Sequence, residues 1–223
     1  MSYNDLLQQI TSKIKGKVAL SFSYQAEDVV VLHLLLQCGV KSLEVFTLDT
    51  GKHFPQSEEF HKEVEEFFGI TIKRYLPNQN SVKSLEKKLG LWGMRDSLEN
   101  RHLCCHIRKV EPLKRALKNK SAWVTGLRAS QSVTRSDLKI VEFDENFSLF
   151  KINPIAFWSE KQTFDYIKEY NLPLNSLYHQ GFKSIGCAPC TRAVGKDDDV
   201  RSGRWWWEEP EHKECGLHIK EKA

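Results

Sequence analysis

The sequence predicts an α/β fold with a mainly parallel sheet that is covered by helices on both faces. In the first third of the chain, short apolar segments typical of strands alternate with helical segments of ten or more residues. Helices of that length between strands act as crossover connections, which make neighbouring strands parallel. Because parallel sheets are buried on both sides, we expect helices on each face.

The elements of the first third have clear boundaries. Three strands are expected, at residues 17–23, 42–49 and 71–76. Two helices are expected between them, at residues 26–37 and 56–68. Gly39 and Gly69 follow these two segments, as glycine commonly does at the C-terminus of a helix.

The rest of the chain continues the pattern with shorter elements. Helical pieces are expected around residues 104–109 and from about Pro112, a residue suited to a first helical turn. A core strand is expected at residues 121–127, and a hairpin is expected from residues 139–143 and 149–152. Ser159 is a good N-cap for a helix that runs to Tyr170. We expect a single domain over residues 1–223, with an α/β core at about 17–172 and an irregular C-terminal region at about 173–223.

Composition excludes several classes of protein. The 33 Lys and Arg residues against 29 Asp and Glu residues give a formal net charge of +4, and no block of five or six like charges occurs. We therefore expect no nucleic-acid partner. Residues 1–15 lack the apolar core of a signal peptide, and no run approaches 18 apolar residues. We expect a cytoplasmic protein without a membrane partner, and the sequence leaves its oligomeric state open, a homo-oligomer included.

A serine-rich turn, SFSYQAED at residues 21–28, joins the first expected strand to the first expected helix. Ligands of parallel α/β sheets bind at the carboxyl ends of strands, where helix N-termini offer unpaired N–H groups to anions. Ser21 and Ser23 add hydroxyl groups at that point. Serine before a helix is also a plain cap, so the turn alone leaves both a nucleotide site and simple capping open.

Two cysteine pairs indicate a metal or cluster site. Cys187 and Cys190 form a CxxC in a loop with glycine and proline, whereas Cys104 and Cys105 are adjacent at the start of an expected helical piece. Structural zinc sites usually take two CxxC-type pairs, which adjacent cysteines fit poorly. Iron–sulfur clusters accept more irregular spacings. We rank a [4Fe–4S] cluster first, zinc second and two unrelated thiol pairs third.

Several cations are placed to bind an anion. Lys109 lies four residues after Cys105, on the same face of an α-helix. Arg128 and Arg135 follow the expected strand at residues 121–127, and Arg201 and Arg204 precede three tryptophans. Arginine donates bidentate hydrogen bonds to phosphate or sulfate, so the four arginines and the lysine together could hold a dianion. Solvated arginines beside an aromatic anchor are the alternative.

Two of the six cysteines, Cys38 and Cys215, remain once the other four are paired, and Cys38 stands among apolar residues as a small core residue would. Cys215 lies close to the C-terminus, between Glu214 and Gly216, with His212 and His218 nearby. A protonated histidine favours the thiolate form of a neighbouring cysteine. A nucleophile is thus one interpretation of Cys215, and an inert terminal thiol is the other.

Taken together, these segments resemble the assimilatory adenylyl-sulfate and phosphoadenylyl-sulfate reductases, a family with an adenine-nucleotide α-hydrolase-like fold. The resemblance runs from about residue 17 to residue 217. It rests on seven segments in the order of the family: SFSYQAEDVV, LDTGKHFP, CCHIRKVEPL, TGLRASQSVTR, GCAPCTR, GRWWWE and ECGLH.

The resemblance implies a role for each matching position. It implies a [4Fe–4S] cluster held by four cysteines, namely Cys104, Cys105, Cys187 and Cys190. Cys215 would attack the sulfur of the substrate, expel AMP and carry an S-sulfocysteine, from which thioredoxin or a similar dithiol releases sulfite. The implied substrate-binding residues are Ser21, Ser23 and Gly126 for adenosine, and Lys109, Arg135, Arg201 and Arg204 for the phosphosulfate group. The implied setting is sulfate assimilation for cysteine biosynthesis.

The four cysteines resemble the family members that use adenylyl sulfate (APS), although some cluster-bearing members accept the 3′-phosphorylated substrate (PAPS) as well. PAPS reductase activity or dual specificity is therefore the alternative. In one departure, Tyr24 and Gln25 stand where many relatives have a glycine before Ala-Glu-Asp. An ATP pyrophosphatase of related fold, which would carry a Ser-Gly-Gly-x-Asp-Ser loop, and a metal-binding sensor are more distant alternatives.

Overall fold

The computed structural model describes residues 3–40, 42–132, 135–213 and 217. Its strands form one six-stranded sheet in the order β3-β2-β1-β4-β6-β5. The strands are β1 (Val18–Ser21), β2 (Leu43–Leu48), β3 (Ile72–Tyr75), β4 (Ala122–Val124), β5 (Val141–Asp144) and β6 (Leu149–Ile152). Neighbouring strands are parallel except for β5, which runs antiparallel to β6. The expected mainly parallel sheet and its terminal hairpin are confirmed.

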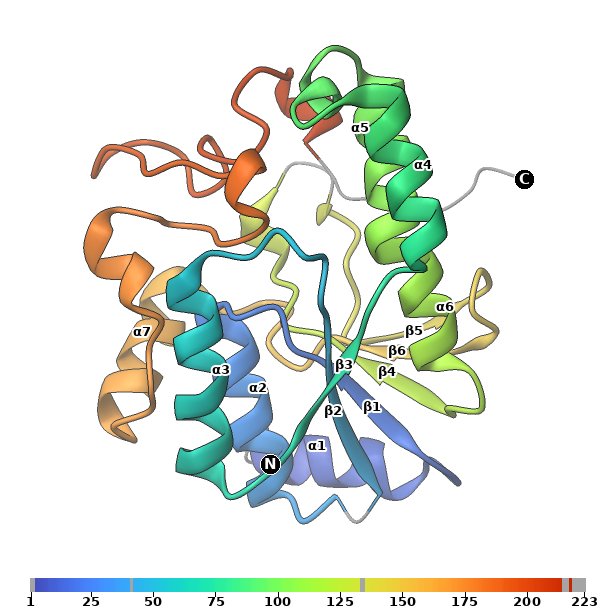
Figure 1. Cartoon of the computed structure of the whole chain (residues 1–223). Helices are drawn as coiled ribbons and strands as arrows, with labels where there is room; N and C mark the ends of the chain where they lie inside the picture. Colours follow the sequence, from blue (N-terminus) through green and yellow to red (C-terminus); the bar gives the residue numbers. More distant parts are fainter. Residues whose placement is uncertain (1–2, 41, 133–134, 214–216, 218–223) are drawn as a thin grey trace.

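Helices cover both faces of this sheet (Figure 1). One side carries α2 (Ala26–Gln37), α3 (Pro55–Phe68) and α7 (Glu160–Glu169), with α1 (Tyr3–Ser12) near one end of α2. The other side carries α4 (Gln79–Leu89), α5 (Leu98–Cys105) and α6 (Glu111–Leu117). Short 3-10 turns complete the chain at Gly93–Arg95, Ala129–Gln131, Ser176–Gln180, Ala188–Cys190 and Pro210–His212.

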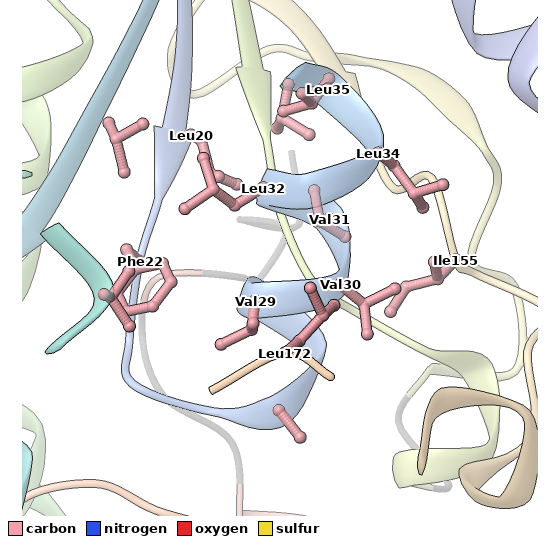
Figure 2. Packing of buried hydrophobic residues seen from close by; sticks show 14 of the residues in the cluster. Leu20, Phe22, Val29, Val30, Val31, Leu32, Leu34, Leu35, Ile155 and Leu172 are labelled. Carbon is pink, nitrogen blue, oxygen red and sulfur yellow. The ribbon is translucent and has the colours of Figure 1, made fainter. Parts of the chain in front are cut away.

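The larger core lies between the sheet and α2 (Figure 2). Leu20 of β1 and Phe22, just after it, extend toward α2, which is apolar around most of its circumference and is buried accordingly. Side chains alternate along a strand, so Ala19 faces the opposite side. There it joins Phe46, Trp123 and the apolar face of α6 in a second core. The two cores fix the strand ends that form the site described below.

Several local expectations are confirmed. Gly69 ends α3 with a left-handed φ of 63°, and Pro112 lies in the first turn of α6. The hydroxyl of Ser159 accepts a hydrogen bond from the backbone N–H of Gln162 and caps α7. Of the segment 121–127, only Ala122–Val124 is strand, because the chain turns at Thr125 toward the pocket.

The adjacent cysteines lie at the end of a helix, which corrects the expectation that they begin one. Ser97 caps α5, since its side chain accepts a hydrogen bond from Asn100 N, so the helix begins at Leu98. Cys105 is its last residue, and a π-helical turn over His106–Val110 continues the chain into α6. Lys109 lies within this wider turn, in which hydrogen bonds join residues five apart.

No helix of the described residues has the length and apolar character needed to cross a membrane.

Candidate functional site

A pocket lies where the carboxyl ends of β1, β2 and β4 meet. One wall, the sheet wall, consists of the ends of these strands and the turns after them, at residues 21–25, 47–48, 50 and 125–127. The facing wall, the C-terminal wall, contains residues 185–187, Arg201, Arg204, Trp205 and Leu217. The pocket encloses about 140 Å³. The location agrees with the rule that ligands of open α/β sheets bind beyond the carboxyl ends of the strands.

The turn after β1 is shaped by the two residues that depart from the family pattern. Tyr24 has a φ of 68°, a conformation that glycine adopts most easily, and its ring is buried beside Phe22 and His53. Its hydroxyl lies 3.1 Å from His61 Nδ1, and burial raises the pKa of Tyr24 to about 12. Gln25 Oε1 accepts hydrogen bonds from Ser184 Oγ at 3.1 Å and Ile185 N at 3.3 Å. This departure therefore joins the sheet wall to the C-terminal wall.

Asp28, in the first turn of α2, is a pocket residue that sequence reasoning missed. Its Oδ2 accepts hydrogen bonds from Ser23 N at 2.6 Å and Ser23 Oγ at 2.7 Å. Burial raises the pKa of Asp28 to about 7, although the bonds from Ser23 oppose the shift. An acidic residue in a first helical turn is so common that the sequence carries no further signal.

The predicted adenosine residues all line this pocket, and each is tightly packed. Ser21 Oγ accepts a hydrogen bond from Trp123 Nε1 at 3.0 Å, and Ser23 bonds to Asp28. A Cβ atom on Gly126 would lie 2.7 Å from Asp28 Oδ1 and 2.9 Å from Glu27 Cβ, closer than carbon atoms pack. Only glycine fits there without movement of the start of α2.

Four of the five predicted anion-binding cations line the same pocket. They are Lys109, Arg135, Arg201 and Arg204. The three arginines are buried, and protein carbonyl or amide oxygens orient them. Arg204 Nη1 donates to Ile185 O at 2.6 Å, and Arg201 Nη2 donates to Lys213 O at 2.8 Å. Arg135 Nη1 donates to Gln131 Oε1 at 2.5 Å.

Arg128 does not line the pocket. Its guanidinium is 2% exposed and pairs with Glu27, with Nη2 at 2.7 Å and Nε at 3.0 Å from Glu27 Oε1. A further bond runs from Nη1 to Ser130 Oγ at 2.9 Å. The chain turns after β4 so that Arg128 crosses the first turn of α2, where Glu27 stands. We therefore assign Arg128 a role in stabilising the fold through its ion pair with Glu27.

The four paired cysteines line a second, smaller cavity. Cys104 and Cys105 reach it from the end of α5, and Cys187 and Cys190 reach it from the CxxC loop. Lys109, Cys187 and Trp205 line both this cavity and the larger pocket. Thr50 Oγ1 lies 3.3 Å from Cys187 Sγ, at hydrogen-bond distance for sulfur. The two cysteine pairs, which are distant in sequence, thus lie together in one cavity beside Lys109.

The spacing of the thiols bears on what they hold. A tetrahedral zinc site with bonds of 2.3 Å places its sulfur atoms roughly 3.8 Å apart. In the described part of the chain, no three of these sulfur atoms lie within 4.8 Å of one another. A cubane cluster offers one iron to each thiolate and so accepts wider spacing. Burial raises the pKa of Cys190 to about 11, and nearby Cys187 adds to the shift while Lys109 and Arg204 oppose it.

Trp205 separates the two cavities and is surrounded by guanidinium groups. The guanidinium carbons of Arg101 and Arg204 each lie 4.7 Å from its ring centroid, and that of Arg201 lies 5.7 Å away. Arg101 is fully buried and also donates from Nε to Glu208 Oε1 at 2.7 Å. Cation–π contacts of this kind favour a desolvated cation, so Trp205 supports the positive C-terminal wall.

His53 is a second pocket residue that the sequence did not single out. Its Nδ1 lies 3.2 Å from Glu58 Oε1, and burial lowers its pKa. Asp49, His53 and Glu58 come within 4.8 Å of one another, as metal ligands do. However, Arg74 Nη1 already pairs with Glu58 at 2.6 Å and with Asp49 at 3.3 Å. The carboxylates of Asp49 and Glu58 are therefore already paired with the guanidinium group of Arg74.

Cys215 lies outside the described residues. Leu217, two positions further along the chain, is described, lines the pocket and packs against the second core.

The arrangement agrees with comparisons to known proteins. Residues 17–193 match the family model described as "Phosphoadenosine phosphosulfate reductase domain". The chain belongs to this family. The adenosine 5′-phosphosulfate reductase of Allochromatium vinosum is 46% identical, with 98% of this chain and 85% of the relative aligned. The adenosine 5′-phosphosulfate reductase of Burkholderia cepacia is 44% identical, with 96% of this chain and 85% of the relative aligned. The expected family resemblance is confirmed, and the chain is an enzyme of this family.

Solved structures support the same fold. The phosphoadenylyl-sulfate (PAPS) reductase of Candida auris superposes with a TM-score of 0.70 at 29% identity, covering 87% of this chain and 91% of that one. Yeast FAD synthetase superposes with a TM-score of 0.61 at 17% identity, covering 86% of this chain and 64% of that one. At that identity the likeness concerns the fold alone, which is adenine-nucleotide α-hydrolase-like.

Proposed function

We propose that this enzyme reduces adenylyl sulfate to sulfite and AMP, with Cys215 as the nucleophile and thioredoxin or a similar dithiol as the reductant. The observation that carries the proposal is one pocket with two different walls. Strand-end turns suited to a nucleoside face a wall of buried arginines suited to a dianion, and four cysteines lie beside both. The names of the relatives agree with this chemistry.

Each wall supplies a different part of the binding. The adenosine would lie against the sheet wall, beside Ser21, Ser23 and Gly126, where a side chain at Gly126 would collide with Asp28 and Glu27. The phosphosulfate would lie against Lys109, Arg135, Arg201 and Arg204. Charge-assisted bonds from guanidinium groups to phosphate or sulfate oxygens are among the strongest polar contacts in proteins. Because these arginines are already oriented by protein oxygens, little side-chain entropy is lost on binding.

The proposed reaction proceeds in two balanced steps. The Cys215 thiolate attacks the sulfur of the sulfate group, a sulfur–sulfur bond forms, and the bond from sulfur to the phosphate oxygen breaks. AMP leaves with that electron pair. A thiolate of the dithiol then attacks Cys215 Sγ and expels sulfite, and the second thiol resolves the resulting mixed disulfide. The dithiol is oxidised by two electrons, and the sulfur of sulfate is reduced by two.

Cys104, Cys105, Cys187 and Cys190 would hold a [4Fe–4S] cluster. The adjacent pair Cys104–Cys105, which fits a zinc site built from two CxxC-type pairs poorly, supports a cluster over zinc. When bound, such a cluster supplies fixed charge and a rigid cross-link beside the pocket. Lys109 lines both cavities, so its ammonium group would orient the phosphosulfate from a position beside the four cysteines. We place the reaction in the cytoplasm, in sulfate assimilation for cysteine biosynthesis.

Turnover of the two sulfonucleotides tests the proposal. Protein purified without oxygen is supplied with thioredoxin and either adenylyl sulfate or its 3′-phosphorylated form, and sulfite and AMP are measured. We expect adenylyl sulfate to be preferred in kcat/KM. A preference of more than about tenfold for the phosphorylated form, roughly 1.4 kcal/mol, would favour PAPS reductase activity instead. Release of pyrophosphate from ATP would support a pyrophosphatase and contradict the proposal.

A further inference from the structure

Three segments that are distant in sequence meet at the side chain of Arg95. Arg95 lies in the 3-10 turn Gly93–Arg95, just before α5. Its Nε and Nη2 both donate to the carbonyl oxygen of Pro189, at 3.2 Å and 2.5 Å. Pro189 is the second of the two residues between Cys187 and Cys190. A single guanidinium thus binds the middle of the CxxC loop.

Aromatic rings surround the same guanidinium. Its central carbon lies 4.6 Å from the ring centroid of Trp92, 4.8 Å from that of Trp206 and 5.1 Å from that of Trp207. Trp206 and Trp207 are nearly perpendicular, with an interplanar angle of 84°. Each such contact contributes about 0.5–2 kcal/mol, depending on how far the cation is desolvated. The rings fix the plane of the guanidinium and therefore the direction of its two bonds to Pro189.

One side-chain and one backbone hydrogen bond connect this contact to the two halves of the cysteine site. Asn100 Nδ2 donates to Gly93 O at 3.0 Å, which ties the turn bearing Arg95 to α5 and hence to Cys104 and Cys105. On the other side, Trp205 N donates to Cys190 O at 3.1 Å. The segment with the tryptophans is therefore attached to the CxxC loop at two points, once by its own backbone and once through Arg95.

We propose that Arg95 is a positioning residue that holds the CxxC half of the cysteine site against the Cys104–Cys105 half. Both the planar pair of donors and the positive charge are needed. Lysine keeps the charge and the ring contacts but donates from a single atom, so it replaces arginine only in part. The inference rests on the proposed function in one respect, that the four cysteines bind one cofactor.

Arg192 provides a matched control. Its guanidinium carbon lies 5.2 Å from the ring centroid of Trp206, but its side chain is exposed, and within the described residues no hydrogen bond joins that side chain to the CxxC loop. The test compares wild type with Arg95→Met, Arg95→Lys and Arg192→Met. Two quantities are measured: iron bound per chain after purification without oxygen, and alkylation rates of Cys187 and Cys190 in the chelator-treated full-length chain, read by peptide mass mapping.

We expect Arg95→Met to lose most of its iron and to alkylate at Cys187 and Cys190 about tenfold faster, because local opening of the loop becomes easier. The unfolding midpoint of the chelator-treated chain should stay close to wild type. Arg95→Lys should have iron content and alkylation rates between those of Arg95→Met and wild type, and Arg192→Met should match wild type in both. Wild-type iron content and alkylation rates in Arg95→Met would overturn the inference, as would equal effects from Arg192→Met.

Two further outcomes are distinguishable. Wild-type protein that binds no iron would contradict the proposed cofactor, whereas the alkylation rates of the chelator-treated chains would still decide the role of Arg95. If Arg95→Met fails to fold, the comparison of Arg95→Lys with Arg192→Met decides instead. Alkylation of Arg95→Lys at the wild-type rate would then count against the need for the planar donor pair and overturn the inference.

Discussion

The two walls of the pocket are built in different ways. The sheet wall is positioned by two apolar cores, and its polar groups are satisfied locally, as in the bonds from Ser23 to Asp28. The C-terminal wall has little regular structure and is held by arginine side chains that bond to backbone oxygens or stack on tryptophan. The comparison teaches that substitutions in the sheet wall should mainly affect folding and nucleoside fit, whereas those in the C-terminal wall should mainly affect chemistry.

The largest expected effect belongs to Cys215, two positions before Leu217 of the C-terminal wall. Cys215→Ser removes the proposed nucleophile, because a serine hydroxyl is far less ionised than a thiol at neutral pH. We expect kcat to fall by at least about 10⁴-fold, which corresponds to roughly 5.5 kcal/mol. Sulfite release with thioredoxin measures this, and thermal unfolding should be unchanged. Activity within tenfold of wild type would contradict the mechanism.

The next effect concerns the fold beneath the sheet wall. Arg128→Leu leaves Glu27 buried without its guanidinium partner, and loss of one member of a buried ion pair typically costs about 3–5 kcal/mol. We expect the free energy of unfolding, measured by urea titration, to fall by that amount. KM for the nucleotide should change little in protein that remains folded. A large rise in KM with unchanged stability would return Arg128 to the substrate site.

A smaller effect is expected where the sheet wall is tightest. Gly126→Ala places a methyl group against Asp28 and Glu27, and overpacking of this kind typically costs about 1–3 kcal/mol. We expect lower stability together with a raised KM for adenylyl sulfate, measured by steady-state kinetics. Gly39→Ala is a suitable control, because a Cβ there meets nothing within 4 Å and any effect is due to its positive φ. Unchanged KM in Gly126→Ala would mean that this edge does not contact the nucleoside.

The smallest effect, counted per pH unit, concerns the pH dependence of stability. Burial raises the pKa of Asp28 from 3.8 to about 7, so between these values the folded state binds the proton that the unfolded state releases. Stability from this group is therefore complete below pH 3.8 and declines as pH rises toward 7, by at most about 1.4 kcal/mol per pH unit. Asp28→Asn should remove this decline in urea titrations between pH 4 and 7. An unaltered pH dependence would contradict the assignment.

Sequence reasoning succeeded where a local pattern fixes structure. The strand pattern of residues 42–49, the glycine at 69 and the cap at Ser159 each depend on neighbours within a few residues. Sequence reasoning also grouped Cys104 and Cys105 with Cys187 and Cys190, because four thiolates are a common ligand set for a metal or an iron–sulfur cluster. It did not anticipate Arg95, whose partner Pro189 is far along the chain, or the true surroundings of Arg128. Those contacts depend on how the chain turns after a strand, which composition and spacing do not encode.

The helix end at Cys105 shows the same limit. Adjacent cysteines carry no signal for helix start or helix end, and the deciding residue is the cap at Ser97, seven positions upstream of Cys104. A π-turn over His106–Val110 then joins α5 to α6. Reasoning from α-helical spacing therefore identified Lys109 as a neighbour of the cysteines without locating it between two cavities.

The central claim is that Cys215 carries the sulfonate after cleavage of the nucleotide. Wild-type protein, purified without oxygen and freed of dithiol, is mixed with adenylyl sulfate, and AMP and the peptide containing Cys215 are quantified by mass spectrometry. The account predicts one AMP per active chain, with a single sulfonate on Cys215 that thioredoxin then removes as sulfite. Release of AMP in equal amount from a chain whose Cys215 stays unmodified would contradict it.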